Sequence, residues 1–283
     1  MCCFSGPVER VKNTSILVRR CGGRQLVVYE MKVTTSEPVA MILPLHVAPG
    51  SGEDALRFLD LGMHTEFFDQ LDSTFEQLRA LSLPAAGQRE AALAPLRVQA
   101  VGAFDASYVP RLADFARLDP RFRIDDSVWA QLPGYRDVGF AVFQLRAGDL
   151  RVHPMAFDYP ARWPARLCFP TVHVHDGALP ARAQFDHSLY FQGFTRVDIG
   201  SHVIGATGGA GGAHGMYGQW SDQRAGAGVH GPLAAQLVDL DARVFRLTLR
   251  GLRRNDDIWV VPDMREPSLA RTDRGVSAWS PVE

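Results

Sequence analysis

The chain has 283 residues, of which 46% are hydrophobic and 22% charged, as is ordinary for a globular protein with a large core. A formal net charge of −1 excludes the strong positive field that attracts proteins to nucleic acids or to anionic membranes. No stretch reaches the roughly 18 apolar residues of a membrane-spanning helix. We therefore expect a cytoplasmic protein that acts on a small molecule or a peptide and keeps its four cysteines as thiols or metal ligands.

The first part of the chain predicts a β-hairpin followed by a third strand. Residues 14–20 and 24–33 are rich in alternating β-branched side chains, and the Cys-Gly-Gly run at 21–23 predicts a glycine turn between them. The apolar run 38–45 predicts a more buried strand. Helices are expected over 53–61, 65–81 and 109–119, the second because five apolar residues recur at three- and four-residue steps: Phe67, Phe68, Leu71, Phe75 and Leu78.

The middle and the end of the chain predict mainly strands. The strands are expected over 96–104, 139–146, 151–160, 166–176, 183–192, 243–252 and 257–263. Because the helices sit between two blocks of strands, the pattern predicts an α+β fold with mainly antiparallel sheets, in one large domain over 1–283. Gly and Ala dominate 200–231, which predicts a flexible segment, and the polar tail 264–283 predicts irregular structure.

The first candidate site is Cys2. Removal of an initiator methionine before this small residue would leave Cys2 with both a thiol and a free α-amine. An α-amine titrates near about pH 8, so it could act as the general base for the thiol beside it. The alternatives are that Cys2 is a metal ligand, or that Cys2 and Cys3 are ordinary packing residues at the start of a strand.

The second candidate site is the run Thr-Val-His-Val-His-Asp-Gly at 171–177. On a strand, His173 and His175 face the same side, and His187 would lie near them if the two strands pair through the turn at 177–180. Three imidazoles with carboxylates suit zinc, iron or copper. The pattern therefore predicts a metal site of His173, His175 and His187, with Asp176 and Cys2 as further ligands; the alternatives are no cofactor and a solvated sheet face.

Two family resemblances concern the beginning of the chain. Residues 1–20, a Met-Cys start followed by a turn and a hairpin, resemble the opening of cysteine-type N-terminal nucleophile hydrolases, such as class II glutamine amidotransferases and bile-salt-type amidases. Residues 1–50 also resemble an uncharacterised family of bacterial proteins with an N-terminal cysteine and an Ile-Leu-Pro or Val-Leu-Pro strand. The residues that match this second family are Cys2, Pro7, Val8, Thr14, Ile16, Leu43 and Pro44.

Two classes of function follow. The first is an enzyme, and the first resemblance implies an amide-bond hydrolase in which Cys2 attacks. Within that hypothesis we expect His173 or His175 to orient the substrate or stabilise charge. A metal at the predicted histidines would instead imply metal-assisted hydrolysis or oxidation. The second class is a non-catalytic binding or scaffold protein, which predicts that Cys2 lies far from His173 and His175.

Overall fold

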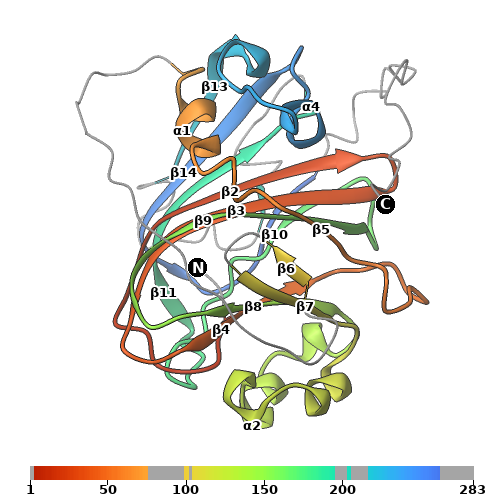
Figure 1. Cartoon of the computed structure of the whole chain (residues 1–283), viewed down its shortest axis with the longest axis vertical. Helices are drawn as coiled ribbons and strands as arrows, with labels where there is room; N and C mark the ends of the chain where they lie inside the picture. The colour runs from red at the N-terminus through yellow and green to blue at the C-terminus, as the bar shows by residue number, and fades with distance from the viewer. Residues whose placement is uncertain (1–2, 76–98, 102–103, 195–202, 205–215, 262–283) are drawn as a thin grey trace.

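The computed structural model describes residues 3–75, 99–101, 104–194, 203–204 and 216–261. Strands far outnumber helices in this part of the chain, and they form three sheets (Figure 1). The predicted α+β class is therefore wrong, and the protein is mostly β. Two of the three expected helices are not α-helices, since 53–61 contains the strand Arg57–Leu59 and 109–119 contains a 3₁₀ turn. Short apolar runs of this length fit helices and buried strands alike.

The largest sheet has seven strands and carries most of the core. Its order is β13 (Met216–Arg224), β14 (Arg243–Arg254), β11 (Arg182–Phe191), β2 (Arg10–Cys21), β3 (Arg24–Thr35), β9 (Gly148–Pro160) and β5 (Arg57–Leu59). All neighbours are antiparallel except β11 and β2, which run parallel. The predicted hairpin is confirmed, since β2 and β3 pair through Gly22 and Gly23, and Gly22 has the positive φ of 61° that glycine readily adopts.

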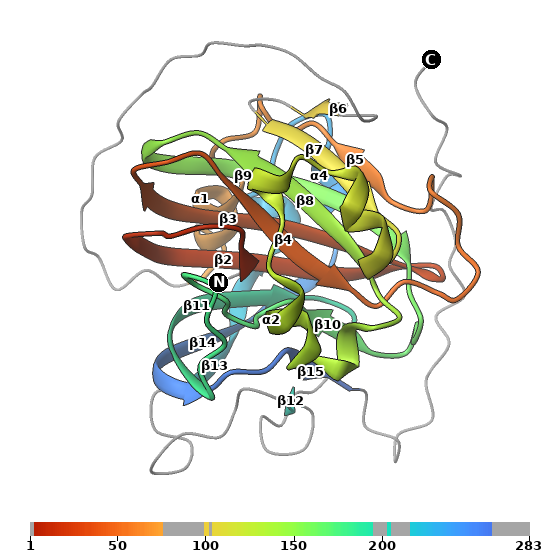
Figure 2. The ribbon, with the colours of Figure 1, turned by 90° about the horizontal axis from the view of Figure 1, so that it is seen from below.

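Two smaller sheets complete the described fold. The five-stranded sheet has the order β1 (Cys3–Phe4), β4 (Val39–Leu45), β8 (Gly139–Leu145), β7 (Phe104–Val109) and β6 (Gln99–Val101). The three-stranded sheet has the order β10 (Leu167–Phe169), β15 (Ile258–Val260) and β12 (Val203–Ile204). Figure 2 shows β4 and β8 packed across β2 and β3, which is the arrangement of a β-sandwich.

The central parts of both large sheets are buried on both faces. The central core lies between them, while Leu17 and Val28 on the other face of the seven-stranded sheet pack under α1 (Phe67–Asp72) and α4 (Ala234–Leu237). The outer face of the five-stranded sheet is covered by α2 (Asp126–Ala130) and by three 3₁₀ turns, η1 (Leu112–Arg117), η2 (Pro120–Phe122) and η3 (Pro133–Tyr135). Figure 1 accordingly shows α1 and α4 at one end and α2 at the other. Double burial explains why β4 is apolar throughout, without the alternation of a half-exposed strand.

Several predicted segments differ from the structure. The helix expected over 53–61 is wrong, because Arg57–Leu59 forms β5 and pairs with β9. The helix expected over 109–119 is the 3₁₀ turn η1. Of the helix expected over 65–81, the structure has α1, which ends at Asp72 before the non-helical residues 73–75, and 76–81 lie outside the described residues. The segment 200–231 was expected to be flexible, but Met216–Arg224 forms β13 on β14 and is followed by the 3₁₀ turn η4 (Ala225–Ala227). Residues 228–231 of that segment are also described, whereas 200–202, 205–215 and the tail 264–283 lie outside the described part.

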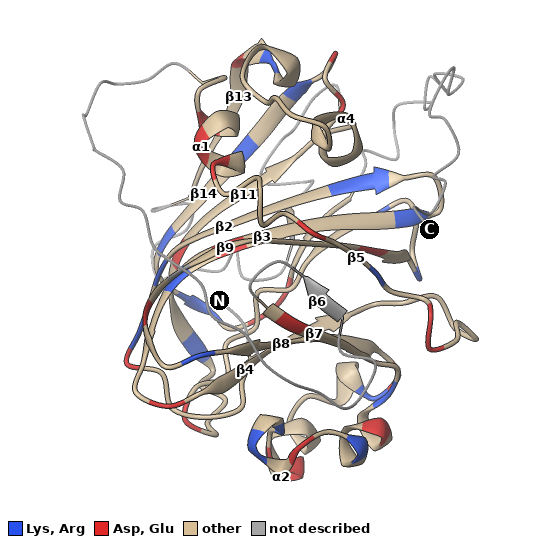
Figure 3. Ribbon diagram, viewed as in Figure 1, with Lys and Arg blue, Asp and Glu red and all other residues tan. Residues whose placement is uncertain are grey.

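Charge and length bear on the expected partners. Figure 3 shows acidic and basic residues interspersed along the ribbon, in keeping with the net charge of −1. Within the described residues, no helix combines the length and the apolar composition that a membrane crossing needs.

Candidate functional site

The segment that carries the two predicted histidines is not a continuous strand. A strand was expected over 166–176, but β10 ends at Phe169 and Pro170 follows it. Proline has no N–H to donate to a sheet ladder, which accounts for the early end. Two isolated bridges then follow, between Cys3 and Val174 and between His175 and Ala178.

Side chains from residues 255–257 hold this segment in the place of a strand partner. The backbone N–H groups of Thr171 and Val172 donate hydrogen bonds to Oδ1 of Asp257, at 2.9 and 3.4 Å. The N–H of His173 donates to Oδ1 of Asn255 at 2.7 Å, and Nδ2 of Asn255 donates back to the carbonyl of His173 at 2.8 Å. These bonds satisfy buried backbone groups that would otherwise destabilise the fold. They also fix the backbone position of His173, from which its side chain extends.

The first described residues lie directly beside this segment. Cys3 and Val174 form a parallel bridge, and the N–H of Phe4 donates to the carbonyl of Val174 at 3.0 Å. The side chains of Cys3 and Val174 share one apolar cluster, while the Phe4 ring meets the His175 ring edge-on, with 5.5 Å between their centroids. Cys2 itself lies outside the described residues.

The structure brings the three predicted histidines together. The His173 ring lies parallel to the His175 ring at a centroid distance of 6.0 Å and nearly parallel to the His187 ring at 5.5 Å, and Phe185 stacks on His173 at 4.5 Å. The expected hairpin through 177–180 is not what joins them. His187 lies on β11, which pairs with β14 and β2 and not with the segment 171–177. Its ring therefore meets those of His173 and His175 through side-chain packing and not through strand pairing.

Asp176 has a structural role in this arrangement. It has a φ of 53°, Gly177 has a φ of 68°, and His175 and Ala178 exchange backbone hydrogen bonds across them. This is the two-residue turn with positive φ at both positions that Asp-Gly favours. Asp176 is exposed at the tip of that turn.

Burial keeps the three imidazoles neutral at pH 7. It lowers the pKa of His175 to about 4 and lowers the pKa of His173 and of His187 well below the usual range. Both ring nitrogens of His173 and Nε2 of His175 are buried and have no hydrogen-bond partner within the described part of the chain. A buried polar atom without a partner costs about 1–3 kcal/mol, so this is a place where a bound molecule would recover free energy.

We expect the stability of the protein to fall with pH below about 6.5, the pKa of an ordinary histidine. Below that pH the unfolded chain binds protons at histidines that stay neutral in the folded protein, which favours unfolding. Above that pH neither state binds these protons, so the free energy of unfolding does not decrease for this reason. For each such histidine the free energy of unfolding decreases by about 1.4 kcal/mol per pH unit. Replacing His187 by Phe should reduce the slope by that amount in urea titrations between about pH 7 and pH 5. Parallel curves for wild type and His187→Phe would contradict the assignment.

A cleft of about 650 Å³ adjoins β1 and the turn at 176–177. One wall is formed by Phe4, Ser5 and Gly177, and the other comes from the 3₁₀ turns and the start of α2. The charged residues of that second wall are Arg123, Asp125 and Asp126. Phe4 both lines the cleft and contacts His175, so one buried ring separates the cleft from the histidine group, whose own side chains do not line it.

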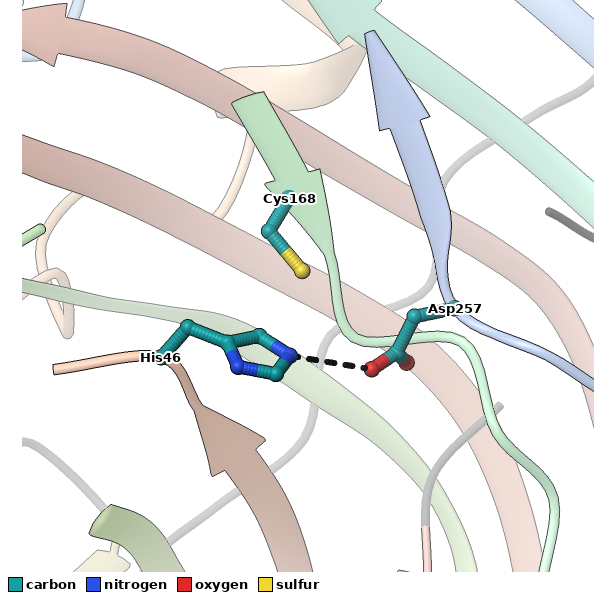
Figure 4. Close-up of side chains that lie close together, drawn as sticks. All are labelled: His46, Cys168 and Asp257. Atoms are coloured by element: carbon teal, nitrogen blue, oxygen red, sulfur yellow. Dashed lines mark ion pairs between the residues drawn. The ribbon is translucent and has the colours of Figure 1, made fainter. Parts of the chain in front are cut away.

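A second group of potential metal ligands includes Asp257, which also accepts the hydrogen bonds from Thr171 and Val172. His46, Cys168 and Asp257 each offer one ligand atom, and these atoms all lie within 4.8 Å of one another (Figure 4). Among the described residues it is this group that meets the distance test for a metal, not His173, His175 and His187. A metal at those three histidines, with Asp176 and Cys2, stays a prediction.

Sequence reasoning missed this second group. His46 directly follows the buried strand β4, Cys168 lies in β10, and Asp257 precedes β15. The one local signal in the sequence was His46, a polar residue directly after a buried apolar strand. Many strands end in a polar residue, so this signal does not indicate a metal site.

No protein-family model matches the chain. Among solved structures, the chain is similar to that of baculovirus P35, with a TM-score of 0.49 and 13% identity over 92% of this chain and 99% of that chain. A mutated baculovirus P35 after caspase cleavage gives a TM-score of 0.45 and 14% identity over 89% of this chain and 100% of that chain. The caspase-8/P35 complex gives a TM-score of 0.39 and 9% identity over 89% and 96%. At these values we transfer no activity from those proteins to this chain.

Proposed function

We propose that the protein is a cytoplasmic enzyme that cleaves an amide bond of a small molecule or peptide, with Cys2 as the nucleophile and the cleft beside β1 as the substrate site. The observation that carries the proposal is the pairing of Cys3 and Phe4 with Val174, between His173 and His175. A scaffold protein with no site here has no need to hold the beginning of the chain against three buried neutral imidazoles.

Covalent geometry supports a role for Cys2 in this place. Consecutive Cα atoms are about 3.8 Å apart, so the chain ties position 2 to the bridge between Cys3 and Val174. The Phe4 ring contacts His175 and lines the cleft.

The proposed reaction proceeds through a thioester. After removal of Met1, Sγ of Cys2 adds to the amide carbonyl carbon while the α-amine takes the thiol proton. The α-amine passes that proton to the leaving nitrogen, the C–N bond breaks, and the acyl group remains on Cys2. Water then hydrolyses the thioester, which releases a carboxylic acid and restores the thiol.

The histidines would act as neutral hydrogen-bond donors in this reaction. Because burial lowers their pKa, the imidazoles are weak bases and stay neutral at neutral pH, so in this proposal the α-amine serves as the base. A neutral imidazole N–H can still donate to the oxygen of the tetrahedral intermediate, where charge develops. His175 is the candidate for this role, because it is partly exposed and its Nε2 has no partner among the described residues.

The first experiment asks whether Cys2 carries a free amine. We expect the intact mass of the untagged protein to be lower than that of the full sequence by one methionine. A cyanobenzothiazole, which condenses with a thiol and an amine on adjacent carbons, should label wild type and Cys21→Ser but not Cys2→Ser. Retention of Met1 would remove the base from the mechanism and end the proposal.

A further inference from the structure

The group formed by His46, Cys168 and Asp257 has the dimensions of a metal site. Nε2 of His46 lies 3.7 Å from Oδ2 of Asp257, and the ligand atom of Cys168 lies within 4.8 Å of both. Two ligands held tetrahedrally at about 2.1 Å from one zinc ion are about 3.4 Å apart. Small side-chain adjustments would therefore bring a nitrogen, a sulfur and an oxygen to bonding distance of a single ion.

The three ligands come from two sheets and are shielded from water. His46 follows β4 of the five-stranded sheet, while Cys168 and Asp257 belong to the β10–β15 region of the three-stranded sheet. The exposed fractions of the His46 and Asp257 side chains are 11% and 7%, and Cys168 is buried. A bound ion would join the two sheets at a point where no ladder hydrogen bonds connect them among the described strands.

Neighbouring groups hold the carboxylate and the thiol in place. Oδ2 of Asp257 accepts a hydrogen bond from the Tyr135 hydroxyl at 2.7 Å. The backbone of Cys168 is fixed on both sides by the buried Gln25 amide, which accepts from its N–H at 3.0 Å and donates to its carbonyl at 2.9 Å. Such outer contacts, which orient the ligands, are a regular feature of metal sites.

Two tryptophans pack against the imidazole ring. The rings of Trp259 and Trp163 lie 4.8 and 5.3 Å from the ring of His46. They restrict the rotation of the His46 side chain and cover its outer side. Figure 4 shows the Nε2 side of the His46 ring directed at the Asp257 carboxylate.

A cysteine–histidine–aspartate relay fits the same residues less well. Such a relay needs one imidazole nitrogen facing the thiol and the other facing the carboxylate. Here Nε2 faces the carboxylate, and Nδ1 is buried without a hydrogen-bond partner, so the thiol does not donate to it. Burial, and then the charge of Asp257, also raise the pKa of Cys168 well above its usual value, which makes it a poor nucleophile.

We propose that His46, Cys168 and Asp257 bind one zinc-class divalent cation through Nε2, Sγ and a carboxylate oxygen. The combination of nitrogen, sulfur and oxygen ligands is one that zinc accepts. On binding, the Cys168 thiol loses its proton to solvent. Three protein ligands leave a fourth tetrahedral position for water.

The test compares metal binding in the full-length protein and its variants. After chelation and reloading with zinc alone, we expect one zinc per chain by elemental analysis. The cobalt-loaded protein should show the near-ultraviolet absorption of a cobalt–thiolate bond. That absorption should disappear in Cys168→Ser, and zinc affinity should fall at least about tenfold in His46→Gln, since an outer or inner ligand change typically has that effect. The controls Cys21→Ser and His230→Gln should match wild type.

His46→Gln decides the matter if Cys168→Ser fails to fold, because His46 lies at the edge of the group. Zinc should raise the thermal unfolding midpoint of wild type, since a ligand that binds the native state stabilises it, and should not raise that of His46→Gln. Wild type without stoichiometric zinc, or folded His46→Gln with unchanged affinity, would overturn the proposal. Cys2→Ser should bind zinc as wild type does, so failure of the acyl-transfer proposal would leave this result unchanged.

Discussion

Replacing Cys2 by alanine should lower amide cleavage by about three orders of magnitude or more, as the loss of a catalytic nucleophile does in other enzymes. The thiol is the atom that forms the acyl bond, and in the proposed mechanism the neutral histidines cannot replace it as nucleophiles. The measurement is the rate of arylamine release from a panel of N-acyl arylamides and peptide arylamides. Mass analysis after acid quenching should show the acyl group on Cys2 of the wild-type protein.

Matched variants separate the nucleophile from the residues around it. Cys21→Ser removes a partly buried thiol at the end of β2 and should leave the rate unchanged. His175→Phe keeps a ring beside Phe4 but removes the N–H donor, and it should lower kcat by about 10²-fold with little change in KM. An acyl adduct that persists in Cys2→Ala, or equal rates for wild type and Cys2→Ala, would show that Cys2 is not the nucleophile.

Local sequence was sufficient for some strands and not for others. The β2–β3 hairpin follows from two β-branched runs around Gly22 and Gly23, whose conformational requirement is local. Arg57–Leu59 carries no such signal. It becomes a strand because it pairs with β9, while Arg57 bonds to Asp158 on that strand and Phe58 packs on Phe143. These partners are distant in sequence, so spacing alone could not distinguish a strand from a helix there.

The residues of the candidate site also differ in whether local sequence was enough to place them. Alternation along an extended segment placed His173 and His175 on one side, and their rings do lie face to face. The residues that hold the segment, Asn255 and Asp257, lie in the polar run before β15, and nothing in that run indicates contact with residues 171–173. Likewise, nothing local in the sequence shows that His46 meets Cys168, because the two are brought together by the packing of separate sheets.

Replacing Asn255 by alanine should destabilise the protein by roughly 3 kcal/mol or more. Its buried amide makes three hydrogen bonds, to the N–H and the carbonyl of His173 and to the carbonyl of Pro180, and each backbone group left without a partner costs about 1 kcal/mol or more. Because these bonds set the position of His173, amide cleavage should fall together with stability. Urea unfolding monitored by circular dichroism gives the free energy.

Two further variants show whether the hydrogen bonds themselves are responsible. Asn255→Asp keeps an oxygen for the His173 N–H but places a second oxygen against two carbonyls, so its loss of stability should equal or exceed that of Asn255→Ala. Gln131→Ala also removes an amide that bonds to a backbone carbonyl, that of Ser127, but on the surface, and it should change stability by no more than about 0.5 kcal/mol. If Asn255→Ala were as mild as Gln131→Ala, the His173 segment would be held by its apolar contacts, and the position of the histidines would not depend on residues 255–257.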